Sequence, residues 1–142
     1  MAAIVDRPFR RALHPLHAFL LGGAATLFLG ALLADLAYAS SYEIQWTNFA
    51  SWLIVGALVL GAGVVAWAIV DQLRDSRERG RRPVYLVLVV ATWALGLINA
   101  LIHARDAWGG MPAGLVLSVV VVVLACAALW VAFAGMRAGD VP

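Results

Sequence analysis

The sequence predicts an all-α fold: an integral membrane four-helix bundle with up-down-up-down topology and both termini in the cytoplasm. Three observations predict it, namely an apolar composition, four apolar stretches of roughly 20 residues, and an uneven distribution of arginine. Hydrophobic residues make up 64% of the 142 residues, charged residues only 13%, and the mean hydropathy is +0.93. A soluble domain has about 25% charged residues, so this chain lacks the polar surface of a water-soluble domain.

The four stretches form one transmembrane domain over residues 1–142. They cover about residues 17–38, 49–70, 84–102 and 114–136. Each approaches the roughly 20 residues that a helix needs to cross a bilayer. The connections between them are short, so consecutive helices are expected to run antiparallel.

The predicted connections differ in composition. We expect loops at 40–48 and 71–83, and a third connection that contains the helix breakers Gly109, Gly110 and Pro112. The fourth stretch has almost no polar group, so we expect it to be purely structural or to face lipid.

Arginine is concentrated on one side of the predicted bundle. With four spans, the two termini and the middle loop share a side that holds nine arginines, whereas the other side holds only Arg105. The nine are Arg7, Arg10, Arg11, Arg74, Arg77, Arg79, Arg81, Arg82 and Arg137. Cytoplasmic loops of membrane proteins carry the excess of positive charge, so both termini are expected to be cytoplasmic.

Cysteine usage and charge exclude several other classes of protein. Cys126 is the single cysteine, so no intrachain disulfide can form. We find no catalytic triad and no phosphate-binding loop, so we predict no catalytic residue and leave open whether the chain is an enzyme. The arginines flank apolar runs rather than forming a polar face, so no nucleic-acid partner is expected.

Ionisable residues at the span ends are predicted to form two clusters. Charge is costly in a bilayer, so an ionisable residue there indicates a function. His17 and Asp35 are 18 residues apart, which is five helical turns and about 27 Å along one helix face. Asp71 ends the second span at the depth of His17. The inner cluster contains His14, His17 and Asp71, and the outer cluster contains Asp35, Asn99 and His103.

One stripe of the third span is polar or small and should face the bundle interior: Thr92, Gly96, Asn99 and His103. Each cluster could pair a histidine with a carboxylate in a low-dielectric setting. The alternative is that residues at span ends are solvated by the headgroup zone, and that Asn99 makes an ordinary interhelical hydrogen bond.

The histidines also suggest cofactors. His14 and His17 are three residues apart and could both reach one metal ion, with Asp71 as a third ligand. Haem b or a quinone could bind beside His14, His17, Asp71 or His103. His17 and His103 are expected at opposite interfaces, so they cannot ligate one iron within a chain.

Several segments match a known family pattern. They are His14-Pro15-Leu16-His17, Ala34-Asp35-Leu36, Ala50-Ser51-Trp52-Leu53-Ile54 with the later Gly56 and Gly61, and Asp71 at the end of the second span. Through these segments, over about residues 13–106, the chain resembles the uncharacterised bacterial membrane family catalogued as domain of unknown function 2231. Typical members also have a histidine near the start of the third span, where this chain has Tyr85 and Leu88.

The resemblance implies a four-helix protein of the bacterial inner (cytoplasmic) membrane, with redox partnership as an expectation. We therefore expect a small subunit that anchors a partner or relays electrons or protons through a haem or quinone site. The alternatives are a purely structural or assembly subunit of a larger membrane complex, and a dimeric metal or proton transporter. The expected partners are the lipid bilayer and either further copies of the chain or a larger complex.

Overall fold

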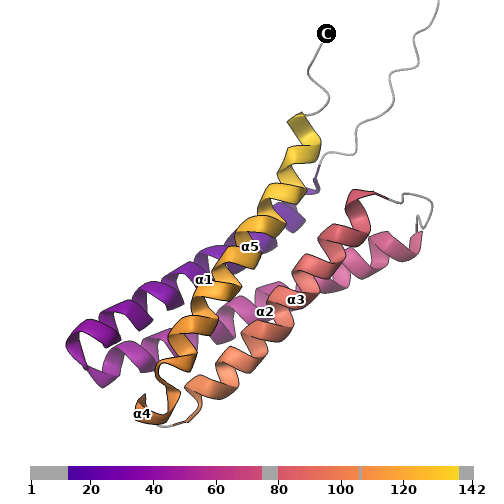
Figure 1. Ribbon diagram of the computed structural model, residues 1–142. Helices are drawn as coiled ribbons and strands as arrows, with labels where there is room; N and C mark the ends of the chain where they lie inside the picture. Colours follow the sequence, from indigo (N-terminus) through magenta and orange to yellow (C-terminus); the bar gives the residue numbers. More distant parts are fainter. Residues whose placement is uncertain (1–12, 75–79, 106, 138–142) are drawn as a thin grey trace, which may run out of the picture.

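The chain folds into four long helices and one single helical turn (Figure 1). The computed structural model describes residues 13–74, 80–105 and 107–137. The helices are α1 (Pro15–Ser41), α2 (Ile44–Arg74), α3 (Arg81–His103), the single turn α4 (Ala107–Gly110) and α5 (Ala113–Arg137). Each long helix is apolar enough, over a sufficient length, to cross a membrane. The predicted all-α membrane bundle is confirmed.

The long helices alternate in direction, and each packs against two others. α1 contacts α2 and α5, and α3 contacts the same two helices. α1 and α3 therefore run parallel and face each other diagonally across the bundle (Figure 1). We call the end where α1 begins and α5 ends the terminal end. The opposite end holds the α1–α2 turn and α4 (Figure 1).

The side of the membrane on which each end lies stays a prediction. Of the nine arginines on which that prediction rests, five lie outside the described residues: Arg7, Arg10, Arg11, Arg77 and Arg79. Arg81 does have a structural contact, because its Nη2 donates a hydrogen bond to the carbonyl of Val131 at 3.1 Å and ties the start of α3 to α5.

The helices extend past the predicted spans, and the predicted loop at 40–48 is wrong. Only Tyr42 and Glu43 separate α1 from α2. Tyr42 has a left-handed backbone (φ 58°), and its N–H bonds to the carbonyl of Tyr38 at 2.8 Å. This is a common way to end a helix and redirect the chain within two residues.

The second connection is also shorter than predicted, whereas the third, predicted at 105–112, spans 104–112. α2 continues to Arg74 and α3 begins at Arg81, which leaves Pro83 in the first turn of α3, where proline is tolerated. The third connection contains α4, a helical turn that was not predicted because glycine and proline usually mark loops.

Small side chains let the helices approach closely in the core. Phe28, Ala31 and Ile54 are buried in one apolar cluster that extends to Val121 of α5. A Cβ atom at Gly96 would lie only 2.8 Å from Cζ of Phe28. The phenyl ring of α1 therefore fits against α3 because position 96 has no side chain.

Candidate functional site

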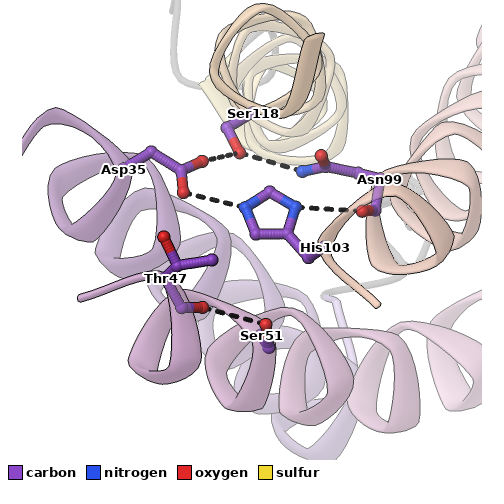
Figure 2. Close-up of polar contacts among 6 residues, drawn as sticks. All are labelled: Asp35, Thr47, Ser51, Asn99, His103 and Ser118. Atoms are coloured by element: carbon purple, nitrogen blue, oxygen red, sulfur yellow. Dashed lines mark hydrogen bonds and ion pairs between the residues drawn. The ribbon is translucent and has the colours of Figure 1, made fainter. Parts of the chain in front are cut away.

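Four polar side chains from three helices meet near the opposite end of the bundle (Figure 2). Asp35 lies near the end of α1 and Asn99 near the end of α3, and each is fully buried. His103 is the last residue of α3 and is 7% exposed, and Ser118 of α5 is 2% exposed. The structure thus brings together the three residues of the predicted outer cluster and adds Ser118.

These side chains form a closed ring of hydrogen bonds. The Asn99 amide donates from Nδ2 to Ser118 Oγ at 2.9 Å, and the Ser118 hydroxyl donates to Asp35 Oδ2 at 2.6 Å. Asp35 Oδ1 lies 2.8 Å from His103 Nε2. His103 Nδ1 donates to the carbonyl of Asn99 at 3.0 Å, and this contact closes the ring (Figure 2).

The ring fixes where protons lie. The Asn99 carbonyl can only accept, so His103 Nδ1 carries a hydrogen. One proton must then lie between His103 Nε2 and Asp35 Oδ1, because two lone pairs would repel at 2.8 Å. It belongs either to an imidazolium beside a carboxylate or to a carboxylic acid beside a neutral imidazole. Both arrangements give the pair zero net charge, which suits a buried position.

The fourth span does not face lipid alone, because α5 supplies two residues to this site. Ser118 bonds to Asp35 and Asn99. Gly114 lies against the imidazole, since a Cβ atom there would be 2.8 Å from Cε1 of His103. Sequence reasoning missed both residues, although Gly114 and Ser118 are small and lie four residues apart on one helix face.

A different histidine site occupies the terminal end. His17 of α1 is 3% exposed, and its Nε2 lies 2.7 Å from the Tyr85 hydroxyl of α3. The indole of Trp67 on α2 contacts both histidine rings, with ring centroids 5.5 Å from His17 and 5.0 Å from His14. His14 caps α1, and its Nδ1 accepts a hydrogen bond from the backbone N–H of Leu16 at 3.2 Å.

His17 has one free ring nitrogen. Its Nδ1 is buried without a hydrogen-bond partner. His103 bonds its Nδ1 to the carbonyl four residues earlier, but the residue four before His17 is Leu13, which precedes α1. His17 therefore has a free Nδ1 because it lies in the first turn of its helix.

Asp71 does not pair with a histidine. It acts electrostatically on His17 and on Tyr85, but no hydrogen bond joins it to either. The expected histidine–carboxylate pair at this end is replaced by a histidine–phenol pair. Among the described residues, no group of three or more His, Cys, Asp or Glu side chains could hold a metal ion.

The two sites repeat one spacing on the same pair of helices. The 18 residues from His17 to Asp35 match the 18 residues from Tyr85 to His103. Because α1 and α3 run parallel, each histidine contact joins them across the bundle, about 27 Å from the other. Between the sites is a cavity of about 30 Å³ with an apolar lining that includes Leu21 and Val89.

Comparison with known proteins identifies a family but no specific function. A family model described as "Predicted membrane protein (DUF2231)" matches residues 13–137. No curated protein and no solved structure matches the chain.

Proposed function

Because the chain belongs to the DUF2231 family of predicted membrane proteins, we propose a function that rests on its buried polar site. It is a small membrane subunit that takes up and releases protons at the Asp35–His103 pair, in the service of a partner in the same membrane. The observation that supports this proposal is the buried 2.8 Å contact between Asp35 Oδ1 and His103 Nε2, which requires one proton between the two atoms. Carboxyl and imidazole groups are the side chains that most often transfer protons in proteins.

The choice of side chains favours proton exchange over a plain packing contact. Neutral amides and hydroxyls can hold membrane helices together, as Asn99 and Ser118 do here. Two ionisable groups at the centre of such a network are costly in a membrane and are a signature of proton relays.

The apolar centre of the bundle favours exchange at one end over conduction through the chain. The cavity between the two sites is lined almost entirely by apolar groups. Apolar cavities stay dry, so this cavity offers no hydrated route between His17 and Asp35. If the arginine bias sets the orientation, the Asp35–His103 pair exchanges protons with the non-cytoplasmic side.

For the electron relay we propose a quinone beside His17 rather than a haem. Both ring nitrogens of His103 are hydrogen-bonded, and Nε2 of His17 is bonded to Tyr85. Of these four ring nitrogens only Nδ1 of His17 has no partner, so His17 and His103 together cannot give a haem iron two axial ligands. A quinone carbonyl needs only one hydrogen-bond donor, which Nδ1 of His17 can supply. A visible spectrum of the purified protein, before and after dithionite, should show no Soret band. A Soret band that shifts on reduction would contradict this choice.

The main test is a pH titration of the purified protein in lipid nanodiscs. Nuclear magnetic resonance of ¹⁵N-labelled histidine reports the protonation of His103, and the infrared carboxyl band reports that of Asp35. We expect both signals to change together with pH, and Asp35→Asn to abolish the change. Asp71→Asn is the matched control, because that carboxyl has no hydrogen bond to a histidine. Signals that stay constant from pH 5 to pH 9, a window of about two units around neutrality, would refute the proposal.

A structural or assembly subunit is the second candidate. The closed ring supports it, because it braces α1, α3 and α5 at one end. If this alternative holds, we expect His103→Gln to lower the stability of the protein. Any complex that co-purifies with the chain should keep its activity.

A further inference from the structure

One hydroxyl group in the helices, that of Thr47, lies outside the ring of hydrogen bonds and is buried without a partner. Most serine and threonine hydroxyls in the described helices donate to a carbonyl three or four residues earlier, as such residues commonly do. Examples are Thr26 to Gly22 at 2.8 Å and Thr92 to Leu88 at 2.7 Å. Among these hydroxyls there are two exceptions. Ser118 donates to Asp35, and Thr47 has no partner.

Thr47 belongs to the same end of the bundle as Asp35. It lies in the first turn of α2, and its Oγ1 atom is buried. Figure 2 shows this hydroxyl pointing toward the Asp35 carboxylate, with no hydrogen bond between them. A buried hydroxyl without a partner costs about 1–3 kcal/mol, so the position calls for a small ligand that can both donate and accept.

The Asp35 carboxylate has acceptor positions left for that ligand. A carboxylate offers about four acceptor positions, and Ser118 and His103 occupy two of them. A water molecule needs two to four polar partners, and Thr47 and Asp35 supply two. A metal ion fits less well, because the described residues hold no group of three His, Cys, Asp or Glu side chains around it.

We propose that Thr47 and Asp35 hold one water molecule between them. This water carries protons between the Asp35–His103 pair and the outer surface of the bundle at the same end, the one that holds the α1–α2 turn. The water accepts the proton that leaves the pair and releases one of its own outward, so its composition is unchanged. Thr47 is well placed for this step, because its neighbours Trp46 and Asn48 are exposed. The inference rests on the proposed function and names the route by which protons reach that site.

The test is hydrogen–deuterium exchange at the pair after transfer of protein-loaded nanodiscs into D₂O, followed by infrared spectroscopy. Thr47→Val keeps the side-chain shape and removes the hydroxyl. We expect it to slow exchange about a hundredfold or more, the range that a positioned proton-transfer group contributes. Thr47→Ser should retain fast exchange. Thr26→Val is the matched control, because that hydroxyl bonds only to its own helix.

Unchanged exchange in Thr47→Val would overturn the inference, and so would equal slowing in Thr26→Val. The exchange rate reports access to the pair and needs no net change in its protonation. A pair that exchanges through Thr47 but never titrates therefore contradicts only the proposed function. A pair that titrates but exchanges independently of Thr47 contradicts only this inference.

Discussion

Asp35 and His103 differ from Asp71 in how their charge is accommodated. Asp35 is fully buried and is hydrogen-bonded to side chains of two other helices, whereas Asp71 is only half-buried and has no such bond. Removing one partner of a buried hydrogen-bonded pair costs more than removing a solvated charge. The two aspartates therefore form a matched pair for experiments.

Asp35→Asn should destabilise the protein by about 1–3 kcal/mol, because the shared proton and a charge-assisted hydrogen bond are lost. Asp71→Asn should change stability by less than about 0.5 kcal/mol. Thermal unfolding in one detergent measures both variants. Equal effects at the two positions would contradict the special role assigned to Asp35.

Gly114→Ala should destabilise the protein by about 1–3 kcal/mol, because the new methyl group forces the imidazole to move. A Cβ atom there would lie 2.8 Å from His103 Cε1. Gly22→Ala is the control, since a Cβ atom at position 22 meets nothing within 4 Å. The control should be neutral or more stable by about 0.5–1 kcal/mol. If chemical denaturation shows Gly114→Ala to be as stable as the control, the close contact is not real.

At the scale of helices, α1 and α3 are joined at both ends although they are not neighbours in the bundle. The Tyr85 contact joins them at one end and the Asp35–His103 contact at the other. Between these contacts the helices meet through the Phe28 ring and Gly96. The two polar contacts therefore hold one parallel pair in register over about five turns.

Double-mutant cycles should give an interaction energy of about 0.5–3 kcal/mol between Asp35→Asn and His103→Gln, because these side chains touch. His17→Ala with Tyr85→Phe should behave in the same way. Tyr85→Phe combined with Asp35→Asn should be additive within about 0.5 kcal/mol, because the sites are far apart. A large interaction energy in that last cycle would show that the two ends communicate through the helices.

At the scale of the whole molecule, the four long helices place the terminal and opposite ends on different sides of a membrane. The arginine distribution predicts that the terminal end lies in the cytoplasm. This assignment decides which compartment exchanges protons with the Asp35–His103 pair.

Fusion reporters at the C-terminus test the orientation. Green fluorescent protein should fluoresce there and alkaline phosphatase should be inactive, because both outcomes require a cytoplasmic C-terminus. Active phosphatase would reverse the orientation and would place the Asp35–His103 pair on the cytoplasmic side.

Much of the fold could be predicted, because a span reveals itself through local composition. The four helices and their alternating directions follow from apolar runs and short connections, and helical periodicity correctly placed Asn99 and His103 on one interior face. The ends of the helices were predicted less well. Polar residues such as those of 40–48 continue a helix once a left-handed cap at Tyr42 reverses the chain.

The sequence by itself determined the class of protein, the number of spans, and the depth and face of His17, Asp35 and His103 on their own helices. Only the tertiary structure decided which of these residues meet. It paired His17 with Tyr85 rather than Asp71, it brought Ser118 to Asp35, and it turned the Thr47 hydroxyl toward Asp35 (Figure 2). Periodicity fixes positions within one helix, whereas contacts depend on how four helices rotate and on which two face each other diagonally. That arrangement is set by close packing of small and large side chains across the whole bundle.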